Sequence, residues 1–295
     1  MRTHARTCQR GLTLVELMVA LAVGLLVVLA AGAMLHNARN AYHDIDDAGR
    51  VQETGRMATA HLADALHQAN HLPWESVPPT AKRPALPPGL RGIDDSRQAD
   101  DLDPALGRAT VATGNGVNKS DILMLGFFGA PRHAGGVVNC SGAAVADGPL
   151  EAAARSWVIY YIAPGKGGEP ELRCRYQGKH GGWTSDAVAR GVEAMQLRYA
   201  IDGDADGRPE RWLDAGAMDE ADWRRVKLVR LALLVRGSRR RPAAVGSPAR
   251  SYPLLPSAGR DDAQRFVEKD GEQRLRAVFQ TTILLRNAAD DRAPP

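Results

Sequence analysis

The first clear pattern along the chain is an apolar run near the N-terminus, from Leu12 to Leu35. It contains no Lys, Arg, Asp or His, and Glu16 is its only ionisable side chain. As a helix rising about 1.5 Å per residue, it is long enough to cross the roughly 30 Å hydrocarbon core of a bilayer. An acidic side chain inside a bilayer costs on the order of 2.5–3.5 kcal/mol. The pattern predicts one transmembrane segment, with a carboxylate that needs a partner.

Beyond this run, over residues 36–72, the helical period continues while the polarity changes. Apolar or small side chains recur at steps of three and four, at Ala38, Ala41, Tyr42, Ile45, Ala48, Val51, Gly55, Ala58, Leu62, Ala65, Leu66 and Ala69. This spacing indicates an amphipathic helix whose apolar stripe packs against a core. No proline lies between Leu12 and Leu72, so both halves are predicted to form one helix. Gly24, Gly32, Gly49 and Gly55 are permitted points of bending.

Proline then ends the helical pattern, and residues 73–107 are predicted to be a connector. Its prolines are Pro73, Pro78, Pro79, Pro84, Pro87 and Pro88, each of which fixes φ and removes a backbone donor. Residues 108–287 are predicted to form a β-rich head, because short apolar or alternating runs are bounded there by Gly, Pro or Asp. The predicted strands are Ile122–Phe128, Trp157–Ile162, Leu172–Tyr176, Val192–Ile201, Val226–Val235 and Ala277–Arg286.

The expected fold class is α+β, a long N-terminal helix packed on an antiparallel β-sheet, because few helix-length segments separate the predicted strands. The basic run from Arg236 to Arg241 is expected to begin a solvated loop, and residues 288–295 a flexible tail. No enzyme signature stands out: there is no Walker lysine, HExxH or nucleophile elbow. The prediction is therefore a protein that is not an enzyme and that requires no cofactor.

The residues from Gly11 to Glu16 resemble the processing site of type IV prepilins and type II secretion pseudopilins. The resemblance implies that residues 1–11 are a leader cut after Gly11 by prepilin peptidase. It also implies that the new N-terminal amine, on Leu12, is methylated. Glu16 then stands at the fifth mature position, where the family's carboxylate pairs with an N-terminal amine in the growing filament. That pairing would compensate the buried charge.

Two other interpretations of the N-terminus remain open. A cleaved secretory signal would use Ala31-Gly32-Ala33 as its small-residue site, although its apolar core is usually about 7–15 residues long. A plain membrane anchor would be oriented by the cytoplasmic Arg2, Arg6 and Arg10. Neither of them accounts for Glu16.

The head extends the resemblance to PilW-type minor pilins. The stretches that carry it are GVEAMQLRYAIDGDADGRPERW from Gly191, Trp223 before RRVKLVRLALLVR, and FQTTILLRN from Phe279. The resemblance implies a single-pass inner-membrane protein with a periplasmic head, later part of an extracellular pilus. Its implied partners are other minor pilins, the major pilin and the inner-membrane assembly platform. Its implied role is pilus assembly or initiation, and so twitching motility, adhesion or DNA uptake. A J-type pseudopilin of type II secretion is the alternative.

Charge and cysteine content refine this interpretation. The leader holds three of the 38 Lys and Arg residues, which leaves 35 against 34 Asp and Glu. This balance gives no reason to expect direct nucleic-acid binding. Outside the leader the cysteines are Cys140 and Cys174, which in an oxidising compartment most simply form one disulfide; two free buried thiols are the alternative.

An acidic tract supplies a candidate metal site. Asp202, Asp204 and Asp206 alternate and are followed by Gly207, as in the first half of an EF-hand loop. Leu213 stands where that loop needs its bidentate Glu, so Glu210 or Asp214 would have to complete a calcium site. A membrane-anchored periplasmic calcium-binding protein is therefore a hypothesis of another class. The alternative is an Asp- and Gly-rich turn between strands.

Overall fold

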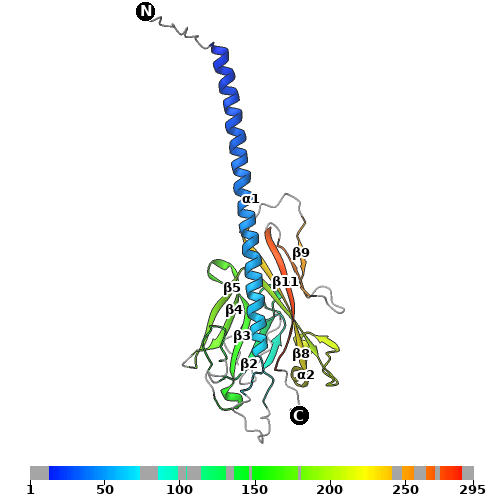
Figure 1. Cartoon of the computed structure of the whole chain (residues 1–295). Helices are drawn as coiled ribbons and strands as arrows, with labels where there is room; N and C mark the ends of the chain where they lie inside the picture. Colours follow the sequence, from blue (N-terminus) through cyan, green and yellow to red (C-terminus); the bar gives the residue numbers. More distant parts are fainter. Residues whose placement is uncertain are drawn as a thin grey trace, which may run out of the picture. The chain divides into compact units, whose positions relative to one another are not determined.

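The computed structural model describes residues 13–73, 86–98, 104, 114–130, 136–145, 148–178, 181–240, 248–255, 264–269 and 273–287. The predicted leader (1–11), Leu12 and the predicted tail (288–295) lie outside the described residues. The chain divides into two units, 1–48 and 49–295. Helix α1, labelled in Figure 1, spans Leu14–Gln68 and contributes residues to both units.

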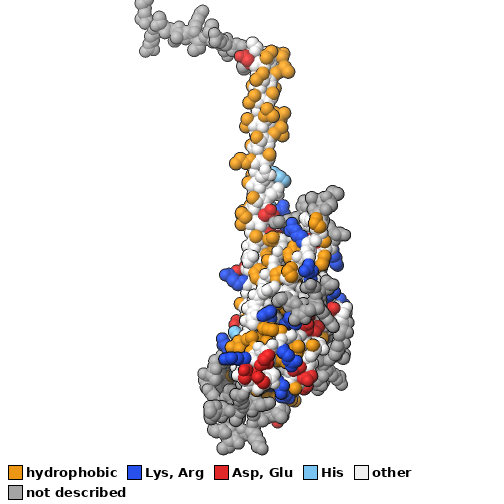
Figure 2. Space-filling view, turned by 90° about the vertical axis from the view of Figure 1, so that its right-hand side faces the viewer, with side chains coloured by type: hydrophobic (Ala, Val, Ile, Leu, Met, Phe, Trp, Pro, Cys, Tyr) orange, Lys and Arg blue, Asp and Glu red, His pale blue; other side chains and the backbone are white. Residues whose placement is uncertain are grey.

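The described part of the first unit is helical from Leu14 onward, and its surface is mostly apolar as far as Leu35. Leu21 and Val28 are 65% and 67% exposed, and Figure 2 shows hydrophobic side chains along this part of the helix. By length and composition α1 can cross a membrane, with a mean hydropathy of 2.7 in its most apolar window. Tyr42 and Ile45 are also exposed. The predicted apolar stripe is therefore buried only from Val51 onward.

The helix ends at Gln68, which corrects the predicted end at Leu72. Asn70 adopts a left-handed φ of 59°, a conformation that stops a helix and that Asn tolerates better than most residues. Its backbone N–H then donates to the carbonyl of Gly126, and its side-chain oxygen accepts from the N–H of Gly89 at 2.6 Å. Asn70 thus turns the chain out of the helix and ties it to the head.

The head, within the second unit, contains eleven strands in its described residues. They are β1 (Leu90–Ile93), β2 (Ile122–Phe127), β3 (Ser156–Pro164), β4 (Pro170–Gln177), β5 (Trp183–Arg190), β6 (Val192–Ile201), β7 (Arg211–Leu213), β8 (Val226–Arg240), β9 (Ser251–Pro253), β10 (Arg265–Val267) and β11 (Arg274–Leu284). The short helical segments are η3 (Val117–Lys119), η5 (Ala152–Ala154), η6 (Lys166–Gly168), η7 (Ala215–Ala217) and α2 (Glu220–Arg224).

The strands form two main antiparallel sheets and one small pair. The sheet orders are β1-β2-β3-β4-β5, β11-β8-β6-β7 and β10-β9. The fold is therefore α+β with an antiparallel head, as predicted, although its strands form separate sheets. All six predicted strands are present, and β6 has the predicted bounds.

Two segments predicted as loops are strands. Residues 90–93, inside the predicted connector, pair with β2 as strand β1, and Leu90 is fully buried. The basic run at 236–240 continues β8, where Arg236 pairs with Arg276 and Arg240 with Arg274 of β11. Neighbouring strands thus supply the backbone hydrogen bonds that a local reading of prolines and arginines misses.

The second half of α1 shares one core with both main sheets. Val51, Ala58, Leu62 and Leu66 are buried in a cluster that also contains Leu125, Tyr160, Leu197 and Leu231. Gly55 permits the closest approach, because a Cβ there would lie 2.1 Å from Cε2 of Phe279 on β11. Gly55 is therefore a packing residue rather than a point of bending.

A buried ionic cluster connects three strands of the β11-β8-β6-β7 sheet. Arg236 and Arg276 are directly opposite each other on β8 and β11, an arrangement that is repulsive for like charges. Glu193 accepts from both arginines, and Arg276 also donates to Glu268. A register shift in β6 spans Glu193. The carboxylates of Glu193 and Glu268 together neutralise the opposed pair, although Glu193 is only 3% and Glu268 only 4% exposed.

Candidate functional site

At the start of α1, Glu16 and Thr13 form a reciprocal cap. The backbone N–H of Thr13 donates to Oε2 of Glu16 at 3.0 Å, and the Thr13 hydroxyl donates to the same oxygen at 3.1 Å. The backbone N–H of Glu16 donates in return to Oγ1 of Thr13 at 3.3 Å. This is a capping box, in which two otherwise unpaired N–H groups are satisfied. The helix dipole also favours a carboxylate there.

This cap was not predicted from the sequence, although the sequence contains its signal. Thr13-Leu14-Val15-Glu16 is the Thr-x-x-Glu pattern that marks a helix start. Both contacts use Oε2, and among the described residues Oε1 accepts no hydrogen bond. The carboxylate is therefore oriented by its own helix while one oxygen remains available to a further donor.

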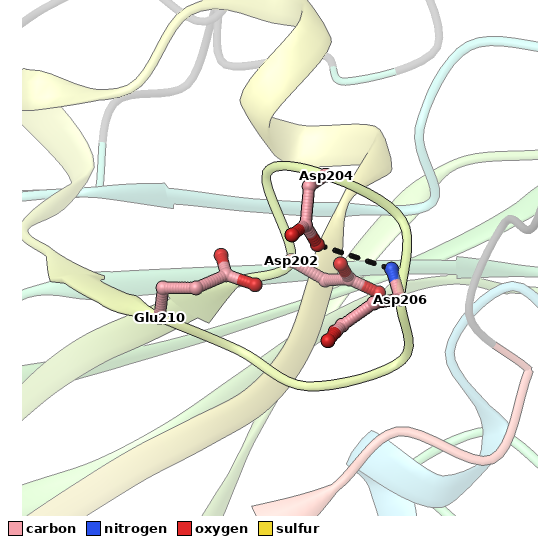
Figure 3. Close-up of side chains that lie close together, drawn as sticks. All are labelled: Asp202, Asp204, Asp206 and Glu210. Carbon is pink, nitrogen blue, oxygen red and sulfur yellow. Dashed lines mark hydrogen bonds between the residues drawn. The ribbon is translucent and has the colours of Figure 1, made fainter.

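The acidic loop between β6 and β7 brings four carboxylates together (Figure 3). Asp202, Asp204, Asp206 and Glu210 each offer one oxygen, and these oxygens lie within 4.8 Å of one another. Asp204, Asp206 and Glu210 are exposed, whereas Asp202 is only 2% exposed. Of the two residues that the sequence offered to complete the site, the structure brings in Glu210.

Backbone hydrogen bonds to the carboxylates shape this loop. The N–H groups of Gly203 and Gly207 donate to Glu210 and Asp202 at 2.8 and 2.9 Å. Asp204 and Asp206 each accept from the N–H two residues later. Gly207 has a φ of +92°. Glycine adopts this conformation readily because it has no Cβ.

The excluded residue, Asp214, has another role. Its Oδ1 accepts from Nε of Arg198 at 2.9 Å and from the Gln264 amide at 3.1 Å. These bonds join β6 to the segment after β7. Asp214 therefore stabilises the sheet through hydrogen bonds and is not part of the acidic cluster.

Cys140 and Cys174 form the predicted disulfide, with Cα atoms 6.4 Å apart. Cys174 lies on β4, and Cys140 lies in a turn closed by the bridge between Val138 and Ala144. The side-chain oxygen of Asn139 accepts from the N–H groups of Ser141 and Ala143, so the turn has its own hydrogen bonds. The disulfide fastens this turn to the five-stranded sheet.

A cavity of about 720 Å³ lies beside this turn and the buried half of α1. Within it, Nε2 of His61 is 3.0 Å from the hydroxyl of Tyr160. Burial lowers the pKa of His61, and a smaller contribution from Asp64 opposes that shift. Burial also raises the pKa of Tyr160. The two rings therefore form a neutral polar pair at neutral pH.

Comparisons with known proteins give two family matches. The model described as Type IV Pilus-assembly protein W matches residues 159–287, and the Prokaryotic N-terminal methylation motif matches residues 6–32. Among solved structures, the type IV-like pilin TTHA1219 from Thermus thermophilus is 16% identical, with a TM-score of 0.41. That comparison covers 82% of this chain and 99% of the other. No curated protein matches the chain.

Proposed function

From the premise that this chain belongs to the PilW family and is a minor type IV pilin acting in pilus assembly, we propose how it enters the filament. The chain is cut after Gly11, methylated on Leu12 and docked into a growing pilus through the apolar helix that follows. The head then selects its neighbours.

The methylation-motif match over residues 6–32 carries this proposal. That motif implies processing by a prepilin peptidase and partners associated with the pilus. The apolar first part of α1 fits a membrane-anchored pilin. We further propose that the anchor lies in the inner membrane with the head in the periplasm, and that other minor pilins, the major pilin and the assembly platform are the partners. Pilin families are typically structural, in agreement with a role without catalysis.

Glu16 is the proposed register residue. A carboxylate in a low-dielectric filament core is costly unless it meets an opposite charge. The cap from Thr13 supplies hydrogen bonds but no charge, and it uses only Oε2. The positive N-terminal amine of a neighbouring subunit would supply the missing charge at Oε1. A subunit docked out of register would leave Glu16 without that partner.

The first test is mass spectrometry of the N-terminal peptide of the protein from its native membranes. A peptide that starts at Leu12, with one added methyl group, is expected. A start at Met34 would instead mean a secreted protein cut after Ala33, and an intact Met1 would mean a plain anchor. Either result would overturn the proposal.

The second test uses Glu16→Gln, which keeps an oxygen for the Thr13 cap and removes only the charge. We expect this variant to be inserted and cut normally but to be depleted from sheared pili. Thr13→Ala is the matched control, because it removes the hydroxyl of the cap and keeps the carboxylate. If Glu16→Gln entered pili as well as the wild type, the charge would have no docking role.

The pili fraction also distinguishes pilus from secretion pseudopilus. A pilin of the PilW type is expected in sheared pili, and its deletion is expected to reduce piliation. If deletion left piliation intact and stopped type II secretion, the J-type alternative would be correct. Twitching, adhesion and DNA uptake are further roles that we propose through piliation alone.

A further inference from the structure

The acidic loop between β6 and β7 has a feature that a solvated turn does not need. Asp202 is almost completely buried. Its Oδ1 is shielded from solvent and nevertheless has no hydrogen-bond partner. Leaving a buried acceptor unsatisfied destabilises the folded state, and more so when the acceptor is charged. Figure 3 shows the Asp202 side chain inside the loop, near the side chains of Asp204 and Asp206.

The charge balance of the loop points in the same direction. Within the part of the chain that the structure describes, Lys227 alone forms an ion pair with any of the four carboxylates. Its Nζ lies 3.9 Å from Oδ2 of Asp202, which is the oxygen that already accepts from Gly207. One ammonium group thus faces four acidic groups, and it leaves Oδ1 without a partner.

We propose that this loop binds one calcium ion through Asp202, Asp204, Asp206 and Glu210. This inference goes beyond pilus assembly and does not depend on it. The bound ion would supply the missing partner of Oδ1 and neutralise the excess negative charge. It would also join the two ends of the loop, since Asp202 follows β6 and Glu210 precedes β7.

The size of the cluster suits calcium. Oxygens bound to one Ca²⁺ at about 2.3–2.6 Å are separated by at most about 4.6–5.2 Å. The four oxygens lie within 4.8 Å of one another, so one ion of this size can reach all of them with small side-chain movements. Mg²⁺ usually binds through one or two carboxylates and keeps several waters, which makes a set of four carboxylates a poorer match.

The affinity is expected to be modest. Leu213 occupies the place of the bidentate Glu, and Glu210 stands at the ninth loop position, which often binds through water. Three of the four carboxylates are exposed. A dissociation constant of about 10⁻⁴–10⁻³ M, as in extracellular calcium modules, is therefore expected.

The test is isothermal titration of CaCl₂ into the chelator-treated full chain in detergent, with MgCl₂ titrated separately. One calcium ion per chain is expected, with at least tenfold weaker binding of magnesium. The double variant Asp204→Asn/Asp206→Asn should weaken calcium binding at least tenfold. Both changes retain an oxygen for the N–H groups of Asp206 and Arg208, so the turn should survive.

The matched control is Glu151→Gln, which removes an exposed carboxylate outside the loop. It should leave the calcium affinity unchanged. Absence of binding at about 10 mM calcium, well above the expected range, would overturn the proposal. So would equal weakening by the control, or equal affinity for magnesium, because either would mean nonspecific binding to surface acids. None of these results would alter the N-terminal peptide, so pilin processing is tested separately.

Discussion

Gly55→Ala gives the sharpest test of how α1 packs on the head. A Cβ at this position would lie 2.1 Å from Cε2 of Phe279 and 2.3 Å from both Cδ2 and Cζ. Ordinary contacts between carbon atoms are about 3.5–4.0 Å, so the ring would have to move. Gly55 therefore fixes how closely α1 approaches β11.

Two opposing free energies determine the expected effect. In an exposed helix, Gly→Ala gains about 1 kcal/mol of stability. Overpacking a core costs about 1–3 kcal/mol, and overlap with three ring atoms justifies the upper end of that range. We therefore expect Gly55→Ala to lower the free energy of unfolding by about 2 kcal/mol.

Gly49→Ala is the matched control, one and two-thirds turns earlier on the same helix. A Cβ on Gly49 would meet nothing within 4 Å, so this variant should gain about 1 kcal/mol. Denaturant unfolding of the full chain in detergent, followed by circular dichroism, would measure both. In a Phe279→Ala background, Gly55→Ala should also become stabilising. Equal stabilisation by both glycine substitutions in the wild-type background would refute the packing argument.

Three further predictions concern the second unit. Replacing Cys140 and Cys174 with Ser should lower the free energy of unfolding by about 3–4 kcal/mol in the chain-entropy model, which a lower denaturant midpoint would show. An unchanged midpoint would mean that the disulfide does little to constrain the unfolded chain. Glu193→Gln should lower the free energy of unfolding by about 3–5 kcal/mol, because it removes the carboxylate that accepts from both Arg236 and Arg276 and leaves Glu268 alone to offset the two opposed charges; an unchanged free energy of unfolding would contradict this. Since the pKa of His61 is lowered in the folded chain, the folded state resists its protonation. Stability should therefore fall as pH decreases through about 6.5, and less so in His61→Gln, which thermal unfolding at several pH values would measure.

Local periodicity predicted the parts of the fold that depend on one segment at a time. The apolar run, the long helix and the six strongest strands all follow from the spacing of hydrophobic side chains. β6 is the clearest case, since its predicted and observed bounds agree. The acidic loop and the disulfide pair were likewise predicted from residue type and spacing, and the structure brings both sets of side chains together.

Three of the errors have a common physical cause, which is contact with a segment distant in sequence. Leu90–Ile93 lies in a proline-rich segment and was predicted as part of a connector. It forms a strand because it pairs with β2. The arginines after Val235 resemble a solvated loop in the sequence. In the structure, β11 pairs with their backbone and Glu193 supplies a negative counter-charge to Arg236. In the sequence Gly55 resembles a residue that weakens the helix. In the structure it makes room for the ring of Phe279.

The ionic cluster around Glu193 has a consequence for errors in strand pairing. Successive side chains of a strand point to opposite faces, so a slip of one residue would turn Glu193 away from Arg236 and Arg276. A sheet misaligned in this way would keep the two arginines opposed but lose the carboxylate that accepts from both of them. An apolar cluster would tolerate such a slip more easily, because one branched side chain replaces another at little cost. The cluster thus acts mainly against wrong alignments, so that β6, β8 and β11 have one alignment far below its competitors in free energy.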